Sequence, residues 1–132
     1  MLSDLSGPGL TAIHALLGEM EGCPPVEKDD GALWQEAISS EQGSAQEALR
    51  RLCLSFGSVA GDLALAHGAR CVVLTGDLTG RIKRLPLFRE FWPRFIEKGR
   101  YRSFMERLPV YHADHPELGL FGAAVAGQIV KT

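Results

Sequence analysis

A long helical stripe constrains the fold of this chain more than any other feature of the sequence. Apolar residues recur at steps of three and four between Ala45 and Ala64, which predicts an amphipathic helix with a broad buried face. Gly57 and Gly61 lie inside this helix, where each glycine costs about 1 kcal/mol relative to alanine. We therefore expect another backbone to approach the helix closely at these two positions.

The ends of this helix carry recognisable signals, and shorter elements surround it. Ser44 followed by Glu47 predicts a capping box, and Gly68 predicts the stop. The apolar run 71–74 reads as a buried strand, and 109–113 as a second one. Further helices are predicted over 9–20, 31–39, 85–97, 101–107 and 120–130. A helical crossover of this length favours two parallel strands, so the sequence predicts a helix-rich α/β fold with a short parallel sheet and a long central helix.

Length and charge narrow the classes of partner. A chain of 132 residues is long enough for a single domain with its own core. The net charge of −2 offers no basic field for nucleic acid, so we expect no nucleic-acid partner. Basic residues gather locally at 81–84 and 98–102. Such clusters are typical of solvated faces, and they could also attract a phosphate-bearing ligand.

The cysteines and the apolar runs bear on location. Cys23, Cys53 and Cys71 are far apart and odd in number, which argues against a disulfide framework or a zinc site. Cys53 and Cys71 lie in apolar runs and are expected in the core. The first ten residues do not resemble a signal peptide, and no run reaches the ~20 apolar residues of a membrane span. A cytoplasmic protein without a membrane partner is expected.

Few polar residues suggest chemistry by themselves. His112, Asp114 and His115 could be drawn as metal ligands, but no fourth ligand stands at useful spacing. Polarity of a loop after a strand is the preferred interpretation, and no metal site is assigned. Asp62, inside the long helix, is expected to make a structural hydrogen bond.

Blocks of sequence along nearly the whole chain match one enzyme family in the same order. They are L-S-G-P-G-L at 5–10, G-D-L-A-L at 61–65, V-V-L-T-G-D-L at 72–78, F-I-E-K-G-R-Y at 95–101, P-V-Y at 109–111 and H-P-E-L-G-L-F-G-A-A at 115–124. Each block is weak alone. Together they resemble the C-terminal portion of the bacterial glucokinases.

The resemblance implies a fold and a nucleotide site. The fold would be part of a ribonuclease-H-like, actin-like ATPase domain, in which two domains close over ATP and sugar. Thr75, Gly76 and Asp77 would form the adenosine-binding turn, at the carboxyl end of a strand where α/β folds bind ligands. The family carries a glycine pair there, whereas this chain has Asp77 at the second position. Its carboxylate could repel phosphates, accept a hydrogen bond from a ribose hydroxyl, or cap the next helix.

The resemblance also shows what these residues do not supply. The family's D-x-G-G-T phosphate loop, its catalytic Asp and its sugar-binding Glu and His pair have no counterpart here, so no catalytic residue is assigned. We expect residues 1–132 to be a single domain, the C-terminal portion of a glucokinase-like fold without its N-terminal phosphate-loop domain. Such a protein would phosphorylate glucose with ATP and Mg²⁺ in glycolysis only within the complete fold. The alternative is a non-catalytic module for nucleotide binding or oligomerisation.

Two further expectations concern surfaces. The turn formed by Ser6, Gly7 and Gly9 with the intervening proline either approaches a ligand or simply starts the first helix. The last helix should expose Leu120, Phe121, Val125 and Ile129, because its family partner domain is missing. Homo-oligomers are expected through this helix or through the sheet edge.

Overall fold

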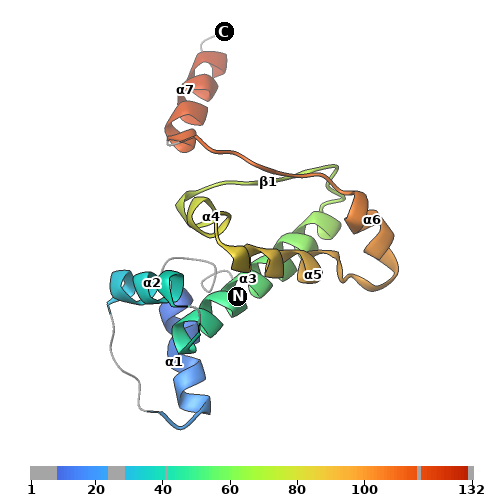
Figure 1. Cartoon of the computed structure of the whole chain (residues 1–132). Helices are drawn as coiled ribbons and strands as arrows, with labels where there is room; N and C mark the ends of the chain where they lie inside the picture. The colour runs from blue at the N-terminus through green and yellow to red at the C-terminus, as the bar shows by residue number, and fades with distance from the viewer. Residues whose placement is uncertain (1–8, 24–28, 41, 116, 131–132) are drawn as a thin grey trace.

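The computed structural model describes residues 9–23, 29–40, 42–115 and 117–130. Its elements in chain order are α1 (Gly9–Met20), α2 (Asp30–Ser39), α3 (Ser44–Ala66), β1 (Val72–Leu74), α4 (Asp77–Ile82), the 3₁₀ helix η2 (Pro86–Glu90), α5 (Phe91–Ile96), the 3₁₀ helix η3 (Gly99–Tyr101), α6 (Arg102–Arg107), β2 (Val110–His112) and α7 (Leu118–Val130). Figure 1 shows α3 running through the molecule as its longest helix. The predicted order of helices and strands is confirmed.

Helix α3 is the shared partner of most other elements. Its first half packs against α1 and α2, and its second half lies along α5. The Cβ that an alanine would place at position 57 lies 2.1 Å from the carbonyl oxygen of Phe91, and at position 61 it lies 2.7 Å from that of Phe95. The predicted close approach of another backbone at both glycines is confirmed, and α5 is that backbone.

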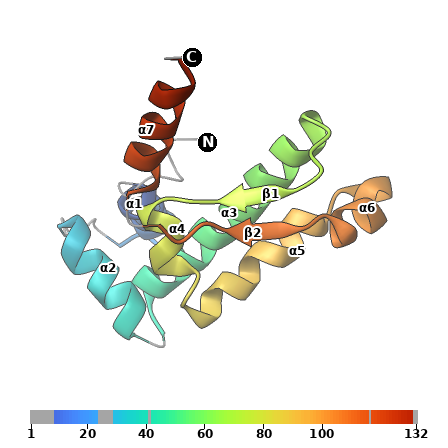
Figure 2. The same cartoon turned by 90° about the horizontal axis from the view of Figure 1, so that it is seen from above.

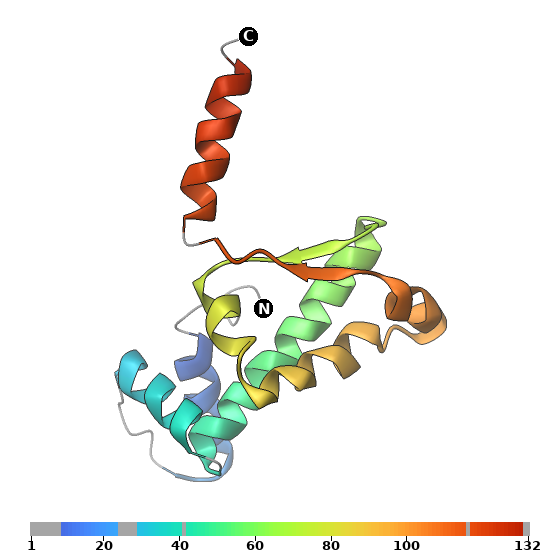
Figure 3. The same ribbon diagram turned by 45° about the horizontal axis from the view of Figure 1, so that its top comes forward.

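The two strands pair in parallel, as predicted, with Val72 opposite Val110 and Leu74 opposite His112. They lie side by side over α3 and α5 (Figure 2). These helices cover one face of the sheet, as the tilted view makes clear (Figure 3). The central pair, Val73 and Tyr111, points the other way and is 54% and 58% exposed. The expectation of a buried strand at 71–74 is therefore wrong for one face, and Cys71, just before the strand, is exposed rather than in the core.

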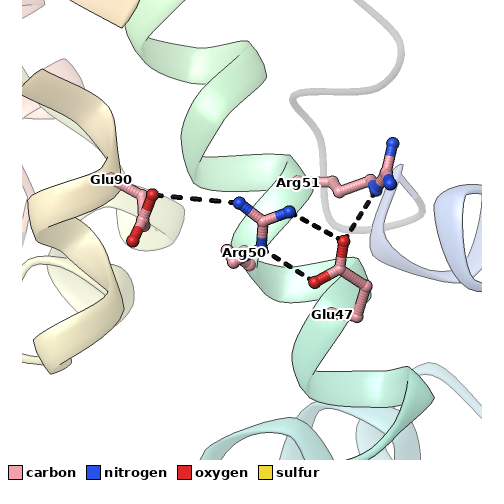
Figure 4. Close-up of polar contacts among 4 residues, drawn as sticks. All are labelled: Glu47, Arg50, Arg51 and Glu90. Atoms are coloured by element: carbon pink, nitrogen blue, oxygen red, sulfur yellow. Dashed lines mark hydrogen bonds and ion pairs between the residues drawn. The ribbon is translucent and has the colours of Figure 1, made fainter. Parts of the chain in front are cut away.

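The start of α3 differs from the predicted capping box. Gly43 occupies the cap position, and among the described residues no side chain makes a capping bond to the helix. The Ser44 hydroxyl instead bonds Nε2 of His14, 3.0 Å away. Glu47 turns along the helix to accept hydrogen bonds from Arg50 and Arg51 (Figure 4). Two guanidinium groups outcompete a single backbone N–H for this carboxylate, because charge-assisted bonds are the stronger ones.

Helix α7 projects away from the other described elements (Figures 1 and 3). Its residues Leu120, Phe121 and Val125 are exposed, as predicted, while the side chain of Ile129 lies outside the described part. Among the described residues, no helix combines the length and the apolar character that crossing a bilayer requires.

Candidate functional site

A cleft of about 1120 Å³ opens where both strands end. Thr75 and Gly76 follow β1 on one wall, and residues 113–115 follow β2 on the other. The start of α7 and the exposed side of α4 complete the lining. Parallel strands bring their carboxyl ends to one edge of a sheet, and α/β folds bind ligands at that edge. Sequence reasoning predicted one wall of this cleft and not the other.

The predicted turn adopts a conformation suited to glycine. Gly76 has a φ of 102°, and apart from its two neighbours in the chain no atom of the described residues lies within 4 Å of the Cβ position here. A ligand can therefore approach the backbone here without meeting a side chain. Asp77 is exposed and lines the cleft, one residue beyond the cap position, and its side chain makes no capping bond. The interpretation of Asp77 as a helix cap is therefore wrong.

A series of polar contacts joins the glycine turn to His112, the last residue of β2, and to Asp114 beyond it. The Thr79 hydroxyl donates to the carbonyl oxygen of Gly76 at 2.8 Å and lies 3.3 Å from Nε2 of His112. On the other side of the ring, Lys83 Nζ lies 3.1 Å from Nδ1 of His112. Lys83 also donates to Asp114 at 2.8 Å. That hydrogen bond holds the pKa of Asp114 below its ordinary value, so Asp114 carries its negative charge at neutral pH.

Sequence reasoning missed Thr79 and Lys83 as members of this site. A hydroxyl three residues after a helix cap commonly bonds back to the cap carbonyl, which is a local signal for Thr79. The orientation of His112 could be predicted from strand alternation, because this residue shares a sheet face with Val110 and that face is covered by helices. No feature of the sequence pointed to Lys83 as a member of the site, apart from its place in the basic cluster at 81–84.

The charges of the cleft are mixed. Arg81 and Arg84 line it, as do the carboxylates of Asp77, Asp114 and Glu117. Among the described residues, no three metal-ligating side chains come together. His112 and Asp114 both contact the ammonium group of Lys83.

The remaining predicted residues lie elsewhere. Ser6 and Gly7 are outside the described residues, whereas Gly9 is buried as the first residue of α1. Asp62 makes the structural bond expected of it, accepting from Lys98 Nζ at 2.6 Å. Lys98 also donates to the carbonyl oxygen of Ser58 at 3.0 Å, so this lysine joins α3 to the end of α5.

Comparison with known proteins identifies the family. A family model described as Glucokinase matches residues 3–129. The glucokinase of Zymomonas mobilis is 44% identical over 122 residues, which are 92% of this chain and 38% of that protein. The glucokinase of Caulobacter sp. K31 is 38% identical over 123 residues, 92% of this chain and 37% of that protein. A crystal structure of a glucokinase from an Antarctic psychrotroph matches with a TM-score of 0.81 and 29% identity, covering 92% of this chain and 38% of that one.

The extent of the match matters as much as the family. The chain spans about 38% of the length of these relatives, and the matched part is their C-terminal portion. The fold is the helix-rich α/β arrangement of that portion, with its short parallel sheet. The order of the matched blocks, the parallel pairing of β1 with β2 and the family match over residues 3–129 agree, and the chain belongs to the glucokinase family.

Proposed function

We propose that this chain forms the adenosine-binding side of an ATP-dependent glucokinase with an actin-like, ribonuclease-H-like fold. The observation that carries the proposal is the cleft at the ends of β1 and β2, with the open backbone of Gly76 in its wall. In this assignment Thr75, Gly76 and Asp77 contact the nucleoside. The whole enzyme would phosphorylate glucose to glucose 6-phosphate in the cytoplasm, as the first step of glycolysis.

Phosphoryl transfer needs more than this side of the site. It requires a loop around the γ-phosphate and a carboxylate that takes the proton of the sugar hydroxyl. The 132 residues contain no D-x-G-G-T segment. Mg²⁺ would be held mainly by the ATP phosphates, as is usual for this ion. We therefore propose that the 132-residue chain alone is inactive and that residues 1–132 act as one domain within a longer fold.

Asp77 determines which part of the nucleotide fits best beside the turn. A carboxylate beside a phosphate is repulsive, whereas a ribose offers two hydroxyl donors. Asp77 is exposed at the edge of the cleft, so its carboxylate can accept both. We assign Asp77 to the ribose and the phosphates to the direction away from it.

Calorimetric titration tests this assignment. Asp77→Ala should weaken ATP binding about tenfold, because a hydrogen bond to a charged group is lost, and should leave 2′,3′-dideoxy-ATP binding unchanged. Glu19→Ala is the control, since Glu19 carries an exposed carboxylate on a helix and does not line the cleft. Tighter ATP binding by Asp77→Ala would show that the carboxylate faces the phosphates instead.

Activity is tested separately from binding. Glucose-dependent ADP production by the purified chain would contradict the proposed inactivity. Mixing the chain with the N-terminal remainder of a full-length relative should restore turnover if the two parts reconstitute the fold. An absence of heat from ATP at millimolar concentration would overturn the nucleotide assignment itself.

One observation favours a second function, oligomerisation. Leu120, Phe121 and Val125 expose apolar surface on a helix that stands away from the body. Such a surface is typical of interaction sites. Light scattering should then detect dimers or larger species. The variant Val125→Asp should dissociate them, whereas Gln128→Asp, at an exposed position of the same helix, should leave them intact. A monomeric mass at high concentration would refute this function.

A further inference from the structure

The chain of polar contacts behind the glycine turn has one consistent arrangement of protons. Thr79 has a single hydroxyl proton, which it donates to the carbonyl oxygen of Gly76 at 2.8 Å. Its oxygen can therefore only accept from His112, whose Nε2 lies 3.3 Å away. Nε2 must carry a hydrogen for this contact to be a hydrogen bond. The contacts of Thr79 thus select the protonation of one ring nitrogen.

The contact at the other ring nitrogen, Nδ1, independently indicates the same tautomer of His112. An ammonium group can only donate, and Lys83 Nζ lies 3.1 Å from Nδ1 of His112. Nδ1 must then be the unprotonated acceptor. Both contacts are satisfied together by the His112 tautomer that carries its hydrogen on Nε2 and leaves Nδ1 as an acceptor. A second bond from Lys83, to Asp114 at 2.8 Å, holds the ammonium group in place at the end of β2.

This series of polar contacts ends at Gly76, in the turn that lines the cleft. The carbonyl oxygen of Gly76 accepts from Thr79 and also from the backbone N–H of Gly80 at 3.0 Å. Two donors restrain the orientation of the peptide unit that joins Gly76 to Asp77. Thr79 is buried, so water does not compete freely for its hydroxyl. Both donors belong to α4, and the Thr79 hydroxyl in turn contacts His112 on the neighbouring strand.

We propose that His112 is a positioning residue of the nucleotide site, acting through Thr79 to hold the turn at 75–77 against the end of β2. Its role is to keep the Gly76 backbone in one orientation before the nucleotide arrives, and not to contact the nucleotide. Preorganisation of this kind raises affinity because less ordering remains for the binding step. The inference rests on the proposed function only for the identity of the ligand.

Two conservative variants of His112 distinguish its contact with Thr79 from its contact with Lys83. In His112→Gln the side-chain amide nitrogen takes the place of Nε2 and can donate to Thr79. In His112→Asn the shorter amide takes the place of Nδ1 and can accept from Lys83, but it cannot reach Thr79. We expect ATP affinity within about twofold of the unmodified chain for Gln, and a loss of about three- to tenfold for Asn, the usual range for one hydrogen bond.

Spectroscopy on the ligand-free chain tests the positioning without any nucleotide. Long-range ¹H–¹⁵N spectra at pH 8 should show His112 as the neutral tautomer with hydrogen on Nε2. Backbone amide signals of 75–77 should move in the Asn variant and stay near their places in the Gln variant. The Nδ1-protonated tautomer, or equal shifts in both variants, would overturn the proposal.

The two inferences fail in different ways. If ATP does not bind while the tautomer and the amide shifts appear as expected, the nucleotide assignment is wrong and the positioning of the turn stands. If ATP binds and both variants lose affinity equally, His112 does not act through Thr79. A lower melting temperature with unchanged affinity in His112→Asn would likewise reduce its role to stability.

Discussion

Gly57 lies where α3 and α5 come closest, and replacing it with alanine tests the packing of the whole molecule. The added methyl group would sit 2.1 Å from the carbonyl oxygen of Phe91 and 2.9 Å from its carbonyl carbon. An ordinary contact between such atoms is about 3.5 Å. The two helices would therefore have to separate by more than about 1 Å, because backbone atoms cannot rotate away as a side chain can.

The loss of folding stability in Gly57→Ala depends on the packing around Phe91. Its ring is fully buried and stacks on Phe88 and Phe95 at 5.2 and 5.3 Å between ring centroids. Overpacking of a core costs about 1–3 kcal/mol, and we expect about 3 here since the added methyl group meets backbone atoms of Phe91 rather than a movable side chain. Alanine returns about 1 kcal/mol of helix propensity. The net loss of about 2 kcal/mol corresponds to a decrease of roughly 6–12 °C in melting temperature for a chain of this size.

Thermal and urea unfolding followed by circular dichroism measure this loss. Gly80→Ala is the matched control, because Gly80 is also in a helix and, beyond that helix's own backbone and its chain neighbours, no described atom lies within 4 Å of its Cβ position. It should leave stability unchanged or raise it by up to about 1 kcal/mol. Gly61→Ala should fall between the two, since one of its two 2.7 Å neighbours is the flexible end of Lys98. Equal stability of Gly57→Ala and Gly80→Ala would refute the reasoning.

Three further predictions concern single side chains. Burial raises the pKa of the Cys53 thiol from 9.0 to about 11, so the folded state keeps this proton longer and loses stability as pH rises from 9 to 11; a thiol reagent should modify Cys53 only after unfolding. Hydrogen bonding from Arg50 lowers the pKa of Glu47 to about 2, so its contribution is present above pH 4.5 and disappears as pH falls towards 2 (Figure 4). Glu47→Gln should cost only about 0.5 kcal/mol at pH 7, because the pair is partly exposed, and should cost nothing near pH 2 in an acid-unfolding series. Lys98→Met should lower stability by about 1–2 kcal/mol in urea, since the Asp62 carboxylate and a helix carbonyl lose their donor; an unchanged midpoint would contradict the assigned contacts.

Much of the fold was predictable because helical periodicity is a local property of the chain. The stripe from Ala45 to Ala64 predicted α3, and two glycines in its interior predicted the approach of another backbone, which is that of α5. The capping box at Ser44 failed because arginines one turn away compete for the same carboxylate, which a motif of four residues does not include. The predicted burial of Val73 was wrong for a different reason. A short apolar run has the same sequence pattern whether one face or both faces of its sheet are covered.

The candidate site was predictable only on the side formed by one continuous segment. Gly76 follows a strand directly, so its place at the sheet edge could be predicted from order alone. His112 meets Thr79 across 33 positions, through strand register and the direction of α4. Neither is visible in spacing along the chain. Non-local pairing of this kind becomes apparent only when the strands are aligned.

The isolation of α7 has a consequence for how this part of the chain orders. An isolated helix of 13 residues is marginal in water even for favourable sequences. Helix α7 makes few contacts with the other described elements and contains glycines at 119, 122 and 127. Whatever covers Leu120 and Phe121 must therefore also provide most of the free energy that keeps the segment helical. Ordering and association become one equilibrium for α7. Its amide protons should exchange with solvent at rates that report the concentration of its binding partner.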